Sequence, residues 1–436
     1  MCGTKRPIRQ ARAIPRRRPR QLRTGRLPRV PLAALLLSFL VFLSPELTLA
    51  PLQAVEPDLR LRPIDEASLP LVPHVGARQV ADQRSAGPVQ PASVQLADGP
   101  RYSAALEAAR ELGSAYGVTF AVVRDGTLVW AGSAGRERDG RTELTPDTAL
   151  VIGSVTKTFV AATILELAEE GRVDLDESAR TYLRSLHALS PKITIRQLLD
   201  HTSGLADVFN DTTRVGIEEH PEHAWSTDEL LASLHAPWYQ PGENWAYANT
   251  NYYLLSLVIE QVTGASLTDE LQRRFIGPLG LERTRLLSPT DPSGPLEPAW
   301  TTIFWGSGAM TASAADLARW GDALYGDGIL NADSRAEMLG FNDHDYGLGA
   351  QRIQLPGAAG YGHTGLLNTY TTLLWHFPAE DVTIALEVNR SHVDLGAMVV
   401  AEPPGGPSLL ELATGIKPPE PTPSPSPSPS SRAGGG

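Results

Sequence analysis

The sequence predicts an α+β fold in which one antiparallel sheet takes strands from both ends of the folded body. Strand-like runs with hairpin spacing occur at 118–135 and again between 346 and 389. The stretch between them, roughly 175–300, consists of helical patterns broken by Pro and Gly. These observations favour a sheet flanked by helices, with an all-helical subdomain inserted, over a doubly wound parallel sheet. A body of two such parts usually has its cleft where they meet.

The N-terminal region predicts export. Residues 1–30 carry eleven Lys and Arg and no acidic residue, while the whole chain has a net charge of −11. The rest is therefore strongly acidic, which argues against nucleic acid or an anionic membrane as partner. The apolar run Leu32–Leu43 resembles a signal-peptide core and is short for a membrane span. We expect residues 1–50 to be a signal peptide or an uncleaved signal anchor, with the body outside the cytoplasm or in the cell envelope.

Composition divides the remainder into three parts. Residues 51–100 are rich in Pro without sustained periodicity, which indicates a linker. The folded body is expected at 101–415. The tail at 416–436 is a Pro/Ser-rich stretch of low complexity, which predicts disorder.

The body's elements follow from local patterns. A helix is expected at 102–117, followed by two β-rich runs joined through Asp125-Gly126, a strong hairpin signal. The stretch 150–171 predicts a short strand that runs into a long apolar helix. The last strands are expected in "YGLGAQRIQL", "GYGHTGLLNTYTTLLWHF" and "DVTIALEVN".

One lysine stands out in "GSVTKTF". The chain has only four lysines among 38 Lys and Arg, yet Lys157 lies in an apolar stretch three residues after Ser154. Lysine, unlike arginine, can lose its proton when buried. Three residues along a helix place two side chains on one face, so the amine could activate the hydroxyl as a base. Its pKa would have to fall by about 3.4 units, or about 4.6 kcal/mol. This pair alone leaves open a capped helix start with a solvated lysine.

Two more motifs follow in order, "YAN" at Tyr247–Asn249 and "HTG" at His363–Gly365. With Ser154-x-x-Lys157, and with the phrases "LLDHTSGL" and "GSGAMTASAADLARW", the chain resembles the serine β-lactamase and DD-peptidase superfamily. The similarity is to the branch of class C β-lactamases, secreted DD-carboxypeptidases and related esterases, over residues 101–400. It implies the β-lactamase/transpeptidase-like fold.

The resemblance also implies catalytic roles. Ser154 would be acylated, and Lys157 and Tyr247 would share the proton relay, the latter as a phenol or a phenolate. Asn249 would bind the substrate amide and help to fix Lys157.

Binding roles follow for the third motif. The backbone N–H groups of Ser154 and Leu366 would form the oxyanion hole. Gly365 would leave room for the substrate backbone, and His363 and Thr364 would hold the carboxylate end of a peptide. Many relatives have lysine at the position of His363, and a neutral imidazole attracts a carboxylate less.

Two residues are weaker candidates. Arg352 lies in "YGLGAQRIQL" and is a candidate partner for a substrate carboxylate. Trp305 is a candidate cleft wall, although packing alone would equally explain it. His201 in "DHTSGL" is expected to stabilise its loop rather than act as a second base.

The sequence thus predicts an exported serine hydrolase that forms an acyl-enzyme on Ser154. The favoured activity is a D-alanyl-D-alanine carboxypeptidase that recognises penicillin. An esterase, a D-aminopeptidase or a catalytically silent wall-associated protein remain alternatives. We expect a monomer that acts on small molecules or peptides. No cofactor or metal is expected, because "HPEH" lacks the HExxH pattern and no glycine-rich phosphate loop is present.

Overall fold

The computed structural model describes residues 98–355 and 357–417. The expectations for the signal segment at 1–50, for nearly all of the linker at 51–100 and for the tail beyond 417 lie outside the described residues. Within those two ranges, no helix has the length and apolar character needed to cross a membrane.

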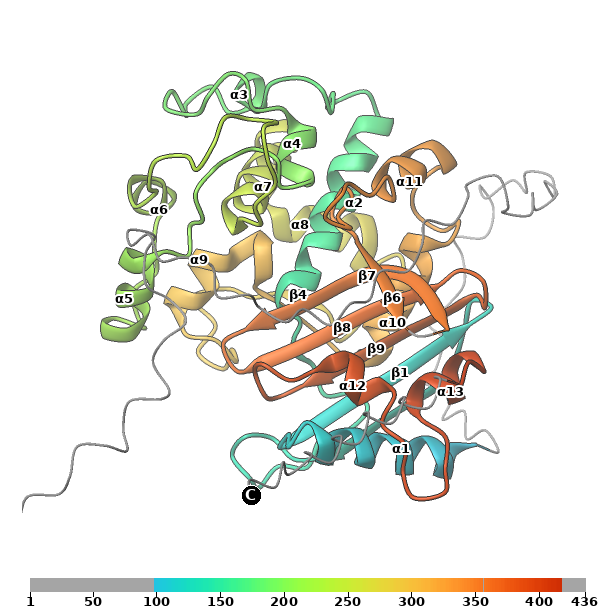
Figure 1. Ribbon diagram of the computed structural model, residues 1–436. Helices are drawn as coiled ribbons and strands as arrows, with labels where there is room; N and C mark the ends of the chain where they lie inside the picture. The colour runs from blue at the N-terminus through green and yellow to red at the C-terminus, as the bar shows by residue number, and fades with distance from the viewer. Residues whose placement is uncertain (1–97, 356, 418–436) are drawn as a thin grey trace, which may run out of the picture. The chain divides into compact units, whose positions relative to one another are not determined.

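A six-stranded antiparallel sheet organises the described chain (Figure 1). Its strand order is β2-β1-β9-β8-β7-β6, so the first strands of the chain lie beside the last. The predicted α+β class is thereby confirmed. The strands are β1 (Gly117–Arg124), β2 (Thr127–Gly135), β6 (Gln351–Leu355), β7 (Ala358–Leu367), β8 (Tyr370–Phe377) and β9 (Val382–Val388).

The first hairpin turns where the sequence predicts it. Asp125 and Gly126 both have positive φ, 47° and 72°, as a two-residue hairpin turn requires. The last four strands also occupy the predicted runs, with one difference. The strand expected from Tyr346 begins only at Gln351. Gly349, at φ +83°, turns the intervening segment against the helix that carries Lys157, where a Cβ would lie 2.5 Å from that of Ala161.

Helices cover both faces of the sheet (Figure 1). On one face α1 (Gly99–Leu112), α12 (Leu395–Val399) and α13 (Leu409–Thr414) bury an apolar cluster against alternate residues of β1, β8 and β9. The other face packs against α2 (Thr156–Glu169) and α10 (Ala314–Tyr325), which share a larger apolar core with the inserted helices.

The predicted helical insertion lies between β2 and β6. A short second sheet of order β3-β5-β4 also forms there. The elements of this region are β3 (Leu150–Val151), the 3₁₀ turn η3 (Gly153–Val155), α3 (Ala179–Tyr182), α4 (Ile195–Leu199), α5 (Asp211–Glu219), α6 (Thr227–Ala232), α7 (Asn249–Thr263), α8 (Leu267–Leu271), the π-helical turn η4 (Gln272–Ile276), β4 (Arg285–Leu286), α9 (Pro298–Gly308), β5 (Met310–Ala312) and α11 (Ala332–Met338).

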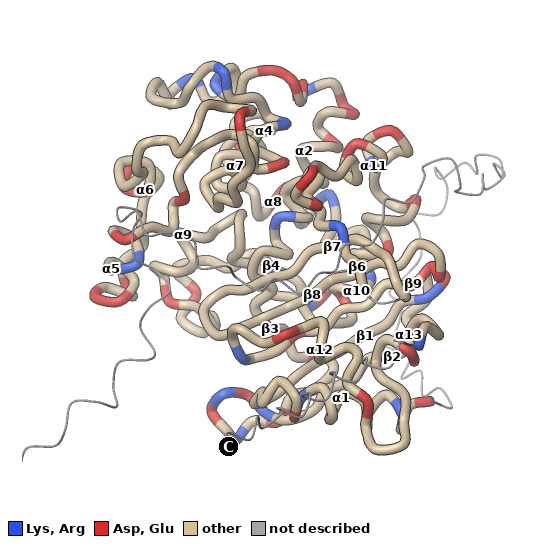
Figure 2. The backbone as a smooth tube through the Cα atoms, viewed as in Figure 1, with Lys and Arg blue, Asp and Glu red and all other residues tan. Residues whose placement is uncertain are grey.

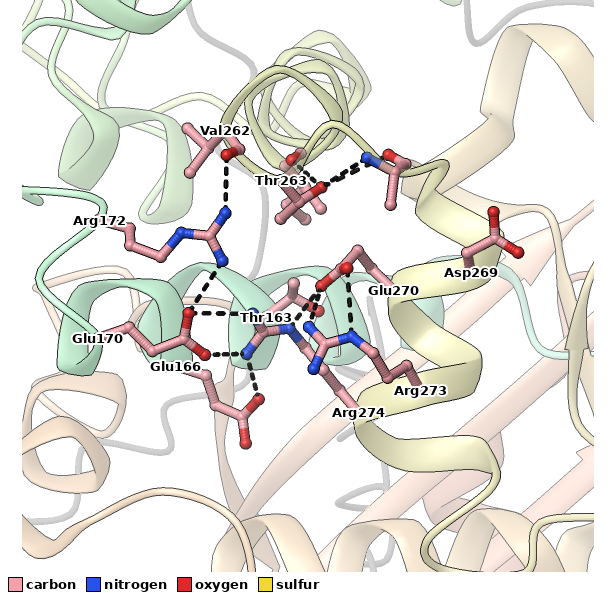
Figure 3. Close-up of polar contacts among 12 residues, drawn as sticks. Thr163, Glu166, Glu170, Arg172, Val262, Thr263, Asp269, Glu270, Arg273 and Arg274 are labelled. Carbon is pink, nitrogen blue, oxygen red and sulfur yellow. Dashed lines mark hydrogen bonds and ion pairs between the residues drawn. The ribbon is translucent and has the colours of Figure 1, made fainter.

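A buried ion cluster ties α2 to α8 and η4 (Figure 3). The Arg274 guanidinium lies 2.8 Å from Glu166, 2.7 Å from Glu170 and 2.8 Å from Glu270, and its side chain is only 3% exposed. Breaking a buried pair of this kind leaves an uncompensated charge, so the cluster fixes α2 firmly. Elsewhere in the described residues, basic and acidic residues are both scattered over the elements, as Figure 2 shows.

Candidate active site

Ser154 lies where β3 gives way to α2, in the single turn η3. The side chain of Lys157, in the first turn of α2, is fully buried, and its Nζ lies 3.0 Å from Ser154 Oγ. Ser154 itself is only partly buried. The structure thus brings the two residues together as the helical spacing predicts.

The surroundings of Lys157 favour an uncharged amine. Its Nζ also contacts Asn249 Oδ1 at 2.8 Å and the Ser307 carbonyl oxygen at 2.7 Å. Both of these atoms can only accept, so they use both hydrogens of a neutral amine. In the uncharged form, the remaining lone pair faces the Ser154 hydroxyl. Burial lowers the pKa of Lys157 from 10.5 to about 7, against an opposing effect of Asp207.

The Ser307 carbonyl reaches Lys157 through a break in α9. Trp305 has φ +22°, which is rare for a residue with a side chain and marks strain. Gly306 follows it, and a Cβ there would lie 1.9 Å from Ser256 Oγ, so only glycine fits. The Trp305 ring packs edge-on against Tyr253 at 5.3 Å between centroids. The observed contact of the Trp305 side chain is therefore one of packing. The unusual backbone conformation of Trp305 directs the Ser307 carbonyl toward Lys157.

Asn249 is held from behind by Asp207. The Asn249 side-chain amide donates to Asp207 Oδ2 at 3.1 Å, and its backbone N–H donates to Asp207 Oδ1 at 3.2 Å. These bonds orient the Asn249 oxygen toward Lys157. Burial raises the pKa of Asp207, and the N–H groups of Phe209 and Asn249 and the charge of Lys157 partly offset this rise. Asp207 was not anticipated, although it is the first acidic residue after the "HTSGL" phrase.

Tyr247 lies just before α7, over the lysine. The Lys157 amine is 4.8 Å from the centroid of its ring. The Tyr247 hydroxyl is buried and makes no hydrogen bond of acceptable geometry within the described residues. Burial raises the pKa of this phenol well above its ordinary value, and an interaction with Ser154 offsets part of the rise. Burial therefore disfavours the phenolate form of Tyr247 considered from the sequence.

Two glycines let β7 approach the serine turn. A Cβ at Gly153, whose φ is +50°, would lie 2.8 Å from the backbone nitrogen of Leu366. A Cβ at Gly365 would lie 2.0 Å from the Ile152 carbonyl oxygen and 3.1 Å from the Ser154 nitrogen. The N–H groups of Ser154 and Leu366 are thus neighbours at the start of a helix, an arrangement suited to an oxyanion. The Leu366 side chain is 43% exposed.

His363 does not present a nitrogen to the cleft. Its side chain is fully buried, with Nε2 2.9 Å from the Tyr346 hydroxyl and Nδ1 2.5 Å from the Thr364 carbonyl oxygen. Burial, reinforced by Lys157, lowers the pKa of His363 to about 3, so the ring is uncharged. Both nitrogens are engaged within the protein in this structure, so it does not support the expected contact with a substrate carboxylate, which stays a prediction.

The carboxylate site expected from Thr364 and Arg352 is also changed. The Thr364 hydroxyl and its backbone N–H both donate to Gln351 Oε1, at 3.1 and 3.0 Å, so neither is free to donate to a substrate. Arg352 pairs with Asp345 at 3.5 Å and lies over the Phe341 ring. Its role as a carboxylate partner is not supported, because its charge is already matched on the exposed side of the hairpin.

Comparisons with known proteins agree with this geometry. A family model described as Beta-lactamase matches residues 103–399. A D-aminopeptidase of Brucella anthropi is 31% identical over 296 residues, which are 62% of this chain and 55% of that protein. The chain thus spans about half the length of the curated relatives it matches.

Solved structures share the fold. A D-stereospecific amidohydrolase from Streptomyces sp. is 29% identical with a TM-score of 0.59, covering 69% of this chain and 98% of that chain. A D-amino acid amidase from Ochrobactrum anthropi SV3, complexed with L-phenylalanine, is 22% identical with a TM-score of 0.59, covering 69% of this chain and 95% of its own. The second likeness shows the fold alone.

Proposed function

The chain belongs to the beta-lactamase family of serine hydrolases, and on that premise we propose that it hydrolyses amides or short peptides of D-amino acids through an acyl-enzyme on Ser154. The D configuration is taken from the names of the relatives, a D-aminopeptidase and a D-stereospecific amidohydrolase. The amide chemistry is taken from the same names, and the preference for a free amino group rests on the site itself.

The observation that carries the catalytic proposal is the 3.0 Å contact between Lys157 Nζ and Ser154 Oγ. The amine takes the hydroxyl proton as the serine oxygen attacks the substrate carbonyl, and the negative charge that develops lies between the N–H groups of Ser154 and Leu366. The Tyr247 phenol, over the same amine, passes a proton to the departing nitrogen and recovers it from Lys157. Water then releases the acyl group by the reverse sequence.

Charge at the site favours a substrate with an ammonium group over one with a carboxylate. The sequence suggests His363 and Arg352 as partners for a substrate carboxylate. In the structure the His363 ring is uncharged, and Arg352 is paired with Asp345. Asp207 instead supplies a carboxylate one hydrogen bond behind Asn249. An α-ammonium two bonds from the scissile carbonyl would be attracted to Asp207 and would favour its ionised form.

An apolar wall adjoins Asp207. The Phe209 N–H donates to Asp207 Oδ1 at 2.9 Å, and its ring is 37% exposed. Its ring centroid lies 5.2 Å from that of Phe304 and 6.0 Å from that of Trp300. These rings offer a surface for an apolar or aromatic substrate side chain.

Matched substrates test the proposal. We expect turnover of D-phenylalanyl p-nitroanilide, little turnover of the L isomer, and loss of turnover when the D substrate is N-acetylated. Asp207→Asn should reduce the preference for the free amine, and Ser154→Ala should abolish acylation. Turnover confined to peptides ending in D-Ala-D-Ala, with covalent labelling of Ser154 by a fluorescent penicillin, would instead establish the DD-carboxypeptidase. Turnover of simple esters alone would indicate an esterase, and no acylation by any of them would leave a binding protein.

We also propose that the enzyme acts outside the cytoplasm, on the basis of the basic residues 1–30 and the apolar run Leu32–Leu43. Fusing residues 1–100 to a reporter that is active only after export should give an active reporter. Deleting Leu32–Leu43 should abolish that signal, and an inactive intact fusion would exclude export.

A further inference from the structure

A chain of buried side chains runs behind Tyr247 and takes no part in the proton transfers described above. It consists of His201, Tyr346 and His363, joined by contacts of 3.2 Å and 2.9 Å. His201 is fully buried and has φ +64°, a backbone conformation that costs free energy in a residue with a side chain. Its ring lies 4.2 Å from that of Tyr247, between centroids.

The tautomer of His201 follows from the backbone. Its Nδ1 lies 3.3 Å from the N–H of Ala248 and 2.9 Å from the side-chain nitrogen of Asn251. A backbone N–H can only donate, so Nδ1 must be an acceptor. The ring hydrogen is therefore on Nε2, and that N–H donates to the Tyr346 hydroxyl at 3.2 Å.

The tautomer of His363 is fixed independently, at the other end. Its Nδ1 faces the Thr364 carbonyl oxygen, which can only accept, so the hydrogen is on Nδ1. Its Nε2 is then an acceptor and receives the Tyr346 hydroxyl hydrogen at 2.9 Å.

The Tyr346 hydroxyl is the one group that satisfies both rings at once, accepting from His201 and donating to His363. Tyr252 is a neighbouring phenol, but its hydroxyl donates to the Leu199 carbonyl at 2.8 Å. It makes no hydrogen bond of acceptable geometry to Tyr346 within the described residues. The hydrogen bonds among these three side chains therefore run in one direction, from His201 to Tyr346 and from Tyr346 to His363.

We propose that Tyr346 and His201 are positioning residues, which fix the ring of His363 through its Nε2 and thereby hold two active-site peptide groups at a fixed separation. At one end, His201 accepts a hydrogen bond from the N–H of Ala248, in the peptide group that follows Tyr247. At the other end, His363 donates to the carbonyl of Thr364, two residues before the N–H of Leu366. The third motif therefore uses histidine as a structural connector, where a substrate contact was expected.

The tautomers can be measured directly, whatever the substrate is. Long-range ¹H–¹⁵N correlation spectra of the full chain with ¹⁵N-labelled histidine should resolve the ten histidines, with His201→Gln and His363→Gln assigning the two signals. At pH 7 we expect His201 protonated on Nε2 alone and His363 on Nδ1 alone. Either opposite tautomer, or a charged ring at either position, would overturn the proposal.

Kinetics test the positioning role, and this arm rests on the proposed function. Tyr346→Phe removes the hydroxyl but keeps the ring, and we expect kcat to fall by about 10- to 100-fold, the range seen when a supporting hydrogen bond is lost around other sites, with KM little changed. In this variant the His363 Nε2 signal should shift, because that nitrogen loses its hydrogen-bond donor, while Nδ1 stays protonated.

Tyr325→Phe is the matched control, because the Tyr325 hydroxyl is also buried but has no hydrogen-bond partner within the described residues. It should leave kcat and both tautomers unchanged. A Tyr346→Phe enzyme with wild-type kcat and an unchanged His363 Nε2 signal would refute the inference. Correct tautomers in a protein that does not hydrolyse D-amino acid amides would refute only the proposed substrate.

Discussion

Replacing Lys157 by methionine should change how stability depends on pH. Burial lowers the pKa of Lys157 from 10.5 to about 7. A difference of about 3.5 pH units corresponds to about 5 kcal/mol, which is what burying the charged amine costs the folded state. Methionine has a similar shape and no charge, so the variant does not carry this cost.

The sign follows from proton binding. Between about pH 7 and about pH 10.4 the unfolded chain keeps the lysine proton while the folded protein has released it. The free energy of unfolding of the wild type therefore rises with pH across this window, by up to about 1.4 kcal/mol per pH unit relative to the variant. Methionine leaves the Asn249 and Ser307 oxygens without their hydrogen-bond donor at every pH, which changes the free energy of unfolding by a constant amount. The test is therefore the pH slope of the free energy of unfolding, and its absolute difference between the two proteins is not used.

Urea unfolding of both proteins at several pH values across that window measures the slope. Lys192→Met, at an exposed position, controls for the loss of a lysine. Stability curves that run parallel for wild type and Lys157→Met would refute the account of Lys157 as a neutral base. In a matching activity measurement, the acylation rate of the wild type should rise tenfold per pH unit below about pH 7 and level off above it.

Three further substitutions test other parts of the structure. Gly365→Ala would place a Cβ 2.0 Å from the Ile152 carbonyl oxygen, so kcat should fall by about 10²–10³ while circular dichroism shows an intact fold. Arg274→Met removes a guanidinium that is 3% exposed and leaves Glu166 without its ion-pair partner, so it should cost about 3–5 kcal/mol in urea unfolding. Arg273→Met, whose side chain is 59% exposed, should cost under about 1 kcal/mol. Burial raises the pKa of Glu387 well above 4.5, so wild-type stability should decline as pH rises from about 4.5 toward neutrality, and Glu387→Gln should lack this decline. For Gly365→Ala, a fall in kcat with a changed circular dichroism spectrum would contradict the expectation. For Glu387, equal pH slopes of stability in the wild type and Glu387→Gln would contradict it.

Features encoded locally could be predicted from the sequence. The pairing of Ser154 with Lys157 needs only one helical turn, and the turn at Asp125-Gly126 needs only two residues that tolerate positive φ. The strands of the sheet could be placed because their β-rich composition and hairpin spacing can be seen in the sequence alone.

Features that depend on burial or on a distant partner could not be predicted. The carbonyl of Ser307 is chemically like any other, and only the unusual backbone of Trp305 aims it at the lysine. His363 suggests a binding residue until its burial and its contact with Tyr346 are known. Arg352 suggests a free cation, because its pairing with Asp345 depends on how the chain turns into β6.

The pairing of β1 with β9 has a consequence for how the chain is made. Thr119 and Glu387 are hydrogen-bonded across a separation of 268 residues. In the sheet, β9 pairs with β1 of the N-terminal hairpin and with β8, and β8 pairs with β7, the strand that lines the site. During synthesis the β1–β2 hairpin leaves the β1 edge unpaired until nearly the whole body, including β9, has left the ribosome. Ordering of the catalytic cleft is therefore a late event, and a nascent chain halted before residue 382 would expose a strand edge prone to aggregation.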